Sequence, residues 1–398
     1  MHKQTRTTWM VGIPLTLGIC TGTIACGGGG GGGGSQPSQP QPGPGAAAAY
    51  ILDPSTASVP QTDPTGTINY YPSGISSTGA WYITTPTGYY LNGALTAFPN
   101  AKVTGGTVTA VVGAGGPYIW ASYSLSSGQN GLAILNLTTS NIIQVPGVDT
   151  GGVDSANDPF PLVLSPDGSS AFVYVEAANG TETGQFETLT AAGVPTVFTG
   201  ALAGFEPAAR STAGWTVGSV FASNASRARQ PALRAALLWK HRALKARGKA
   251  IPATQSPSSA SLISPTGTVI TLNGSQPYPT SVNDTGVAAG YDGATAVFWD
   301  ASGNEHGLQD GTVWDVLDNG LMVGSYGDTV FRGGMWQPGG YLWDLTSLST
   351  LLPNETMTDA IEMQTSSGSI LCAGSDPSGN PIFFGIVPAP TPSLRKAK

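Results

Sequence analysis

Short apolar segments, abundant glycine and proline, and an irregular internal repeat together predict an all-β protein. The specific prediction is a β-propeller of about seven four-stranded blades, within a range of six to eight. The 398 residues include 56 glycines and 31 prolines, and only 10% of them are charged. These values argue against long surface helices, which need charged residues and are weakened by Gly and Pro.

The overall composition excludes several other classes of protein. Hydrophobic residues make up 40% of the chain and aromatic residues 8%, which is enough to build a core and excludes simple charged disorder. The formal net charge of -7 disfavours a nucleic-acid-binding protein. We therefore expect no nucleic-acid partner, and no motif in the chain indicates a cofactor.

The first residues are typical of an export signal. Lys3 and Arg6 precede a weakly apolar run, residues 9–25, that has the length of a secretory signal and is too soft for a stable membrane span. Residues 26–49 are rich in Gly, Pro and Gln and predict a flexible tether. The predicted domains are a signal peptide at 1–25, this tether, a propeller at 50–388 and a disordered tail at 389–398.

The end of the export signal carries a resemblance to a known class. Thr23-Ile24-Ala25-Cys26 followed by a glycine run resembles the bacterial lipoprotein signal, although Thr23 stands where that signal prefers an aliphatic residue. The resemblance implies that Cys26 becomes an acylated N-terminus, carrying diacylglycerol and a palmitate-like chain, and holds the protein on a membrane of the cell envelope. The alternative is plain secretion, with Cys26 removed or free.

The chain after residue 50 alternates apolar runs of four to seven residues with turn residues, which is typical of short strands. The clearest predicted strands are 80–83, 108–112, 132–135, 171–175 and 268–272. The clearest predicted turns are Ser165-Pro166-Asp167-Gly168, Ser264-Pro265-Thr266-Gly267 and Asp376-Pro377-Ser378-Gly379.

A repeated pattern favours a propeller over a sandwich or a barrel. It consists of a turn glycine, several apolar residues, a second glycine, a loop, and a strand that usually ends in Trp. The second glycine recurs at Gly290, Gly324 and Gly374, with spacings of 34 and 50 residues and a mean of 42, the size of a propeller blade. We expect each such Trp, in the last strand of its blade, to supply most of the apolar area between blades.

The same pattern also carries a family resemblance. Asn283 and Gly286, then Gly290, then Ala296-Val297-Phe298-Trp299 resemble the HAF family of bacterial extracellular repeats, which implies a propeller-like domain. The tripeptide that names the family is not kept, and the match is clearest over residues 213–388. In the N-terminal half, residues 164–175 are similar to the turn-strand unit of TolB-like and WD-type propellers.

One segment is strongly basic. Within residues 227–249 lie half of the sixteen Lys and Arg residues of the chain: Arg227, Arg229, Arg234, Lys240, Arg242, Lys245, Arg247 and Lys249. This basic loop is a candidate for binding anionic lipid headgroups or an acidic envelope polymer. The alternatives are an amphipathic helix over 231–247 and a solvated loop that balances an acidic body.

The residues that could support catalysis are few, and no catalytic residue is assigned. His241 and His306 are expected in exposed loops or turns, and no zinc or serine-hydrolase motif is present. Paired carboxylates could come from Asp315, Asp318, Asp328 and Asp344, although Asp is common in turns for structural reasons.

Two further features have structural explanations. Residues 149–158 are rich in side-chain oxygens and loosely resemble a calcium loop, but their spacing differs from an EF-hand and no metal is assigned. Cys372 lies in an apolar run and is expected to be a buried, inert thiol, because the signal takes Cys20 and acylation takes Cys26.

These observations favour an envelope-anchored lipoprotein whose propeller is a binding or scaffolding module for a glycan, a peptide or an anionic envelope polymer. The alternative is a propeller-fold hydrolase or lyase that acts on polysaccharide through carboxylates near the central channel. Buried acids clustered at the channel with raised pKa values would favour the enzyme, and acids scattered over outer turns would favour the binding module.

Overall fold

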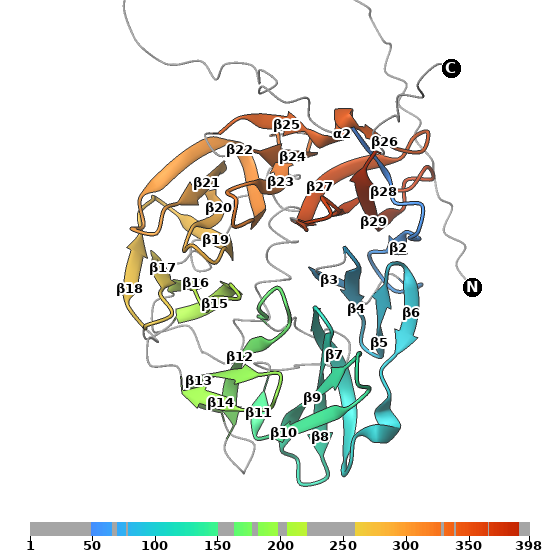
Figure 1. Ribbon diagram of the computed structural model, residues 1–398, viewed down its shortest axis with the longest axis vertical. Coiled ribbons are helices and arrows are strands. Elements are labelled where there is room, and N and C mark those ends of the chain that lie inside the picture. The colour runs from blue at the N-terminus through green and yellow to red at the C-terminus, as the bar shows by residue number, and fades with distance from the viewer. Residues whose placement is uncertain are drawn as a thin grey trace, which may run out of the picture. The chain divides into compact units, whose positions relative to one another are not determined.

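The protein is seen as a computed structural model that describes residues 49–65, 70–76, 79–149, 163–176, 182–197, 205–220, 259–327, 330–337, 340–364 and 366–389. All of them belong to the second of two units of the chain, Gln39–Lys398. Their strands form six hydrogen-bonded sheets, which follow one another in chain order around a common centre (Figure 1). The fold is an all-β propeller, as predicted.

Four sheets contain four antiparallel strands each. Sheet I holds β3 (Tyr71–Ile75), β4 (Trp81–Thr84), β5 (Gly88–Leu91) and β6 (Ala94–Ala97). Sheet II holds β7 (Gly106–Gly115), β8 (Tyr118–Leu125), β9 (Asn130–Asn136) and β10 (Ile142–Pro146). Sheet III holds β11 (Val148–Asp149), β12 (Ser170–Glu176), β13 (Glu182–Thr190) and β14 (Pro195–Val197). Sheet IV holds β15 (Phe205–Arg210), β16 (Thr216–Val220), β17 (Ser259–Ile263) and β18 (Val269–Leu272).

Sheet V is one continuous sheet of seven strands. It holds β19 (Pro277–Val282), β20 (Ala288–Asp292), β21 (Thr295–Trp299), β22 (Glu305–Val316), β23 (Met322–Tyr326), β24 (Arg332–Trp336) and β25 (Leu342–Asp344). The long strand β22 pairs with β21 through its first part and with β23 through its second part. Each of the other five sheets is a single blade. The described residues therefore form six separate sheets, and the prediction of seven blades is not confirmed.

Sheet VI joins the two ends of the described chain. It holds β1 (Tyr50–Leu52), β2 (Val59–Pro60), β26 (Ser349–Thr350), β27 (Thr356–Met363), β28 (Ile370–Ser375) and β29 (Pro381–Pro388). β1 runs antiparallel to β29, with Tyr50 opposite Pro388. The first strand therefore completes the sheet built by the last three, which closes the ring by backbone hydrogen bonds.

Helical structure in the described residues is limited to η1 (Asn100–Lys102) and α2 (Leu345–Leu348). Within that part of the chain, no helix has the length and apolarity needed to cross a bilayer. The five strands named in the sequence analysis correspond to β4, β7, β9, β12 and β18, and all three predicted turns are present. In each turn the N–H of the final glycine, at positive φ, donates to the carbonyl of the first residue.

The repeated second glycine has a clear steric cause. A Cβ at Gly290, Gly324 or Gly374 would lie 2.1, 2.0 or 1.8 Å from a carbonyl oxygen of the preceding strand. Each of these glycines pairs with the residue just before a β-bulge in that strand, where the two backbones approach closely. In sheets I and II the corresponding residues are Ile83 and Tyr123, which explains why the repeat is weak in the N-terminal half.

The prediction for tryptophan needs one correction. Trp299 and Trp336 are completely buried and lie between blade-like groups of strands, as expected. They end β21 and β24, however, which are the third strands of their groups and not the last. β21 and β24 contribute side chains to apolar clusters on both of their faces, Ala296 and Trp299 from β21, and Met335 and Trp336 from β24.

Apolar clusters fill the boundaries between neighbouring groups of strands. Such clusters join sheets I and II, II and III, IV and V, V and VI, and VI and I, and one joins the two parts of sheet V. Each buried aliphatic or aromatic side chain contributes roughly 1.5–3 kcal/mol. Among the described residues, no cluster of this kind lies between sheets III and IV.

Candidate functional site

The strands that begin the four-stranded groups of sheets I, II, IV, V and VI share an irregularity. We call β3, β7, β15, β19, residues 311–316 of β22, and β27 the inner strands. Each contains at least one β-bulge, and the extra residues are Ser73, Thr109, Val112, Ala208, Thr280, Trp314, Thr358 and Ile361. A bulge reverses which face the following side chains occupy, so it redirects residues near the strand end.

Hydrogen bonds link the C-terminal ends of these strands from sheet to sheet. Ala114 N donates to Ser73 Oγ between β7 and β3, and Thr280 Oγ1 donates to the carbonyl of Val313 between β19 and β22. In the turns that follow β15, β19 and β22, Ala213 N donates to Asp284 Oδ1 and Asp284 N donates to an Asp318 oxygen. We call this set of strand ends and turns the inner edge.

Asp315 is the most connected acid of the inner edge. Its Oδ1 accepts the hydroxyl of Ser281 on β19 at 2.9 Å, and its Oδ2 accepts the backbone N–H of Met363 on β27 at 3.3 Å. Ser281 Oγ in turn accepts the N–H of Val316. Burial raises the pKa of Asp315 above its ordinary value, although these donors act in the opposite direction. The carboxyl therefore joins three neighbouring inner strands.

Glu362 lies on β27 and reaches the first sheet. Its Oε1 accepts the backbone N–H of Ile75 at the end of β3, at 2.9 Å. Burial, followed by the nearby charge of Asp315, raises the pKa of Glu362 to about 8. Burial and the neighbouring charge of Asp315 therefore favour the protonated form of Glu362, at the contact between sheets V and VI.

A third acid, Asp359, is completely buried on the same strand. Its Oδ1 accepts the indole N–H of Trp314 on β22 at 2.8 Å, and its Oδ2 accepts the hydroxyl of Thr358. Asp359 and Glu362 pair with Ala373 and Leu371, which are two residues apart, so the bulge at Ile361 places both acids on the same face of the strand.

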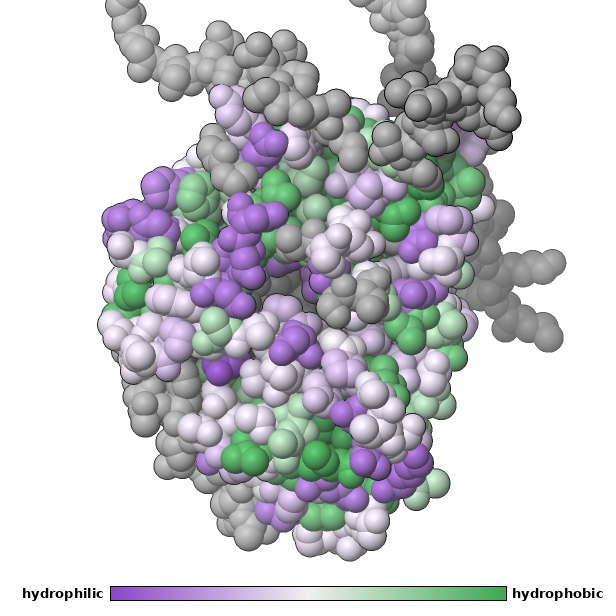
Figure 2. Space-filling model, viewed as in Figure 1, coloured by the Kyte–Doolittle hydropathy of each residue, from purple (hydrophilic) through white to green (hydrophobic). Residues whose placement is uncertain are grey.

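This arrangement is chemically able to do two things. It can hold the ring together, because each of the three acids accepts a hydrogen bond from a neighbouring inner strand. It can also supply a proton at neutral pH, because the pKa of Glu362 is close to 8. Figure 2 shows that hydrophilic and neutral residues surround the centre of the face in view, as expected for a ring with polar groups near its axis.

Of the four predicted carboxylates, Asp315 and Asp318 lie near enough for the charge of Asp318 to contribute to the raised pKa of Asp315. Asp315 alone lies on an inner strand. Asp318 lies in the exposed turn after β22, where it accepts Asp284 N. Asp328 lies outside the described residues. Asp318 accepts a backbone N–H in its turn and Asp344 caps α2, so both have structural partners.

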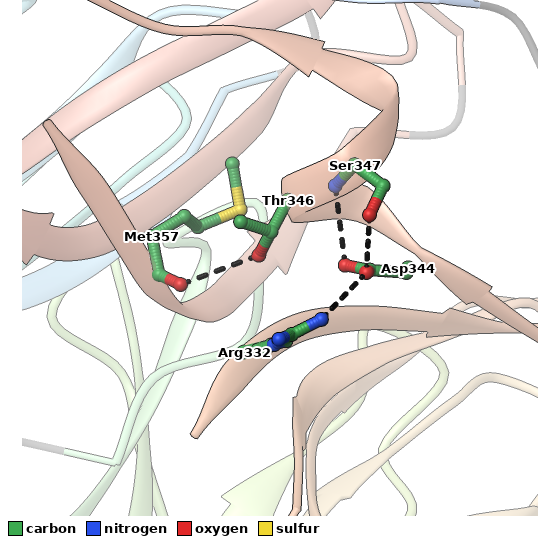
Figure 3. Close-up of polar contacts among 5 residues, drawn as sticks. All are labelled: Arg332, Asp344, Thr346, Ser347 and Met357. Atoms are coloured by element: carbon green, nitrogen blue, oxygen red, sulfur yellow. Dashed lines mark hydrogen bonds and ion pairs between the residues drawn. The ribbon is translucent and has the colours of Figure 1, made fainter. Parts of the chain in front are cut away.

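Asp344 has a structural role at the start of α2 (Figure 3). It ends β25, the outer strand of sheet V, and its carboxylate accepts the backbone N–H and the hydroxyl of Ser347. Its Oδ2 also lies 3.4 Å from Nη1 of Arg332. These donors hold the pKa of Asp344 below its ordinary value, although burial opposes them.

His306 differs from the prediction of a turn. It lies in β22 and its ring stacks on Phe298, with centroids 4.6 Å apart. Its Nε2 is 3.6 Å from Asp300 Oδ2, and its side chain is 47% exposed, so the predicted exposure is confirmed. The strand forms here because β22 continues directly from the Asp300–Asn304 turn and pairs with β21.

Several predicted residues lie outside the described part of the chain: Cys26, His241, the whole basic loop, and residues 150–158 of the oxygen-rich stretch. Asp149, the first of that stretch, is in β11. Within the described residues, no group of three or more His, Cys, Asp and Glu residues is placed to hold a metal ion. Cys372 is completely buried in β28, as predicted, and burial raises the pKa of its thiol.

Comparison with known proteins finds only distant structural similarity. No protein-family model matches the sequence, and no curated protein is recognisably similar to it. Among solved structures, the β-propeller domain of the Trilobed protease from Pyrococcus furiosus has a TM-score of 0.42 and 8% identity, over 83% of this chain and 98% of that domain. The gluconolactonase XC5397 from Xanthomonas campestris has a TM-score of 0.35 and 12% identity, over 84% and 99%.

A prolyl endopeptidase structure gives a TM-score of 0.43 and 10% identity over 80% of this chain, which spans about half of that enzyme. All three resemblances have TM-scores below 0.5, so the activities of those proteins do not transfer to this one.

Sequence reasoning missed Glu362 and Asp359. The sequence feature that could have identified them is the presence of acidic residues within an apolar strand. Thr356–Met363 contains two carboxylates among Met, Ala and Ile residues. Ordinary alternation puts residues three apart on opposite faces, and only the bulge at Ile361 brings them to one face.

Proposed function

We propose that this protein is a non-catalytic binding or scaffolding propeller held at the bacterial cell envelope. The observation that supports this proposal is the use of the inner-edge acids. Asp315, Asp359 and Glu362 each accept a hydrogen bond from an adjacent inner strand, which makes them components of a rigid closed ring. A rigid ring that carries variable turns on one face is a common platform for binding.

The proposal predicts ligand binding without turnover. The full mature chain is tested by calorimetry against a panel of neutral and acidic glycans and of peptides. Saturable binding of at least one class, with the ligand recovered intact, supports the proposal. Absence of binding to every member of the panel, or chemical change in a bound ligand, counts against it.

A second candidate is a hydrolase or lyase that cleaves polysaccharide through the Asp315–Glu362 pair. The observation that favours it is the pKa of Glu362 near 8, since a general acid works best with a pKa near the working pH. The test measures new reducing ends from polysaccharides with the wild type, Glu362→Gln and Asp315→Asn. Release that both substitutions abolish favours the enzyme. Release that is absent, or that persists in both variants, excludes this pair.

Membrane anchoring remains part of the proposal and rests on the sequence around Cys26. We expect mass spectrometry of the mature N-terminal peptide to find diacylglycerol on the Cys26 sulfur and an acyl chain on its amine. We expect Cys26→Ser to be released from membranes. A mature wild-type N-terminus without acyl groups contradicts the anchor and favours plain secretion.

The basic loop is a second proposed contact with the envelope. Replacing its eight Lys and Arg residues by Ser or Gln is expected to weaken binding to vesicles that contain anionic lipid, most strongly at low salt. Unchanged binding across salt concentrations removes this role.

We also propose that the ring has seven blades. The support is the division of β22, whose residues 305–310 form the outer strand of one four-stranded group and whose residues 311–316 form the inner strand of the next. The hydrogen bonds from Ser281 to Asp315 and from Asp284 to Asp318 each join residues 34 apart, which is the spacing of Gly290 and Gly324 in the sequence pattern.

A further inference from the structure

The connection between sheets IV and V is fixed to sheet V by polar contacts. It consists of residues 273–276, which join β18 to β19. At its start, Asn273 N donates to the carbonyl of Gly303 at 2.9 Å, and the carbonyl of Asn273 accepts the indole N–H of Trp299 at 2.6 Å. The first residue of the connection therefore lies against β21 and the turn that follows it.

Asp292, the last residue of β20, binds the second half of this connection. Its Oδ2 accepts Ser275 N at 2.6 Å, and its Oδ1 accepts the Ser275 hydroxyl at 2.9 Å and Gln276 N at 2.5 Å. Partial burial acts to raise the pKa of Asp292, but these donors outweigh burial and hold the pKa below its ordinary value. The ionised form of Asp292 is therefore the form that holds the connection.

Glu305, the first residue of β22, reaches the same connection. Its side chain is partly exposed, but its Oε2 is fully buried and accepts no hydrogen bond from a donor of the described residues. A Cβ at Gly274 would lie 2.5 Å from Glu305 Oε2 and 2.8 Å from Asp292 Oδ2. Both carboxyl groups thus lie against one glycine, and their side chains are hydrogen-bonded to each other.

A hydrogen bond between two carboxyl groups requires one proton, because an ionised carboxyl group can only accept. We call Asp292 and Glu305 the acid pair. Asp292 already accepts three donors from the connection, whereas Glu305 Oε2 has none, so the proton belongs to Glu305 and is donated to Asp292. Burial, followed by the charge of Asp292, raises the pKa of Glu305, which agrees with this assignment.

The other titratable groups beside the acid pair have partners of their own. His306 Nε2 lies 3.6 Å from Asp300 Oδ2, in the turn that precedes β22. Tyr278 on β19 stacks on Tyr291, with ring centroids 5.0 Å apart. Residues 273–276 and strands β17, β18 and β21 contain no titratable side chain. The charge that acts on Glu305 is that of Asp292.

We propose that the acid pair is a pH-sensitive latch, which shares one proton and holds the connection between sheets IV and V against sheet V at mildly acidic pH. When Glu305 loses this proton, two carboxylates lie together against Gly274, and their repulsion loosens the connection. The latch is complete while Glu305 is protonated and is lost as the pH rises through the pKa of Glu305 in the folded protein. It goes beyond the proposed binding function and does not depend on it.

Amide hydrogen exchange of the full mature chain tests the latch, because Ser275 and Gln276 both donate their N–H groups to Asp292. Protection factors are measured by NMR at pH 4.5 and pH 8, with Ala121 in β8 as the reference for global stability. In the wild type, we expect the protection of both amides to fall roughly tenfold relative to the reference between these pH values.

Three variants assign this effect to the acid pair. In Glu305→Gln the side-chain amide donates to Asp292 at every pH, so the protection of Ser275 and Gln276 should be the same at both pH values. Asp292→Asn keeps one acceptor oxygen of two and should weaken this protection at both pH values. Asp310→Asn is the matched control, because Asp310 is an exposed acid of the same strand, and it should behave as the wild type does.

Four results would overturn the latch. The first is equal protection of Ser275 and Gln276 at both pH values in the wild type, and the second is an equal fall in the wild type and in E305Q. The third is a fall at Ala121 as large as that at Ser275 and Gln276, which would assign the effect to global stability. The fourth is recovery of protection at pH 8 on addition of millimolar Ca²⁺, since the acid pair would then bind a metal ion and not a proton.

Discussion

Glu362 Oε1 accepts the backbone N–H of Ile75 across 287 residues of sequence. This contact joins β27 of the last sheet to β3 of the first, on the inner side of the ring. Backbone pairing between β1 and β29 closes the same ring further out. Closure therefore depends on two separate sets of hydrogen bonds, and only the inner set contains a group that titrates near neutral pH.

The first prediction concerns the pH dependence of stability. The pKa of Glu362 rises from 4.5 to about 8 on folding, so between these values the folded protein holds a proton that the unfolded chain has lost. The free energy of unfolding should fall as pH rises through this window, by at most about 1.4 kcal/mol per pH unit, and should then level off.

Glu362→Gln keeps an oxygen for Ile75 N–H and cannot ionise. Urea unfolding of both proteins from pH 5 to pH 9 should therefore give similar stabilities at pH 5 and a more stable variant at pH 8. Parallel stability curves for the two proteins would show that Glu362 does not bind the extra proton.

The second prediction concerns Asp315. Asp315→Ala removes the acceptor of Met363 N and of the Ser281 hydroxyl, and leaving such donors unpaired should cost about 1–3 kcal/mol of unfolding free energy each. Asp315→Asn keeps one oxygen and should cost less. A double-mutant cycle with Ser281→Ala measures the coupling, and a coupling energy of zero would refute the link.

The third prediction concerns the repeated glycine. Gly324→Ala places a methyl group against the carbonyl of Thr312, which we expect to cost about 1–3 kcal/mol through overpacking. Gly307→Ala is the matched control, because Gly307 is also in a strand of sheet V and no atom lies within 4 Å of its added Cβ. Equal melting temperatures for the two variants would disprove the steric explanation.

The fourth prediction concerns the Asp344 cap. Asp344→Ala removes the acceptor of Ser347 N and should lower the unfolding free energy by about 0.5–2 kcal/mol. Asp344→Asn keeps the capping oxygen and should lose much less, because the ion pair with the exposed Arg332 contributes little. If the Asn variant is as unstable as the Ala variant, charge and not capping is the main contribution.

The sequence predicted those parts of the fold that depend on local chemistry. The turn at Ser165–Gly168 needs a glycine at positive φ, and the recurrence of Gly290 and Gly324 reflects a close backbone approach that each blade-like group repeats. Both leave a visible pattern of residues. The third-strand position of Trp299 and Trp336 was not predictable, because the pattern does not show how many strands precede the repeat.

Most contacts of the inner edge could not be predicted from the sequence. Asp315 was named as a candidate, but its partners Ser281 and Met363 are 34 and 48 residues away. Glu362 and Asp359 were not named at all. Bulges decide which face these residues occupy, and a bulge depends on pairing between strands and not on local composition.

Amide hydrogen exchange at Ile75 tests the central claim, that a carboxyl group on the last sheet closes the inner side of the ring. Exchange is compared in the wild type, Glu362→Gln and Glu362→Ala, with Ala121 in the buried strand β8 as an internal reference. We expect protection of Ile75 in the wild type and in the Gln variant, and at least tenfold faster exchange in the Ala variant with the reference unchanged. Equal protection of Ile75 in all three proteins would contradict the claim.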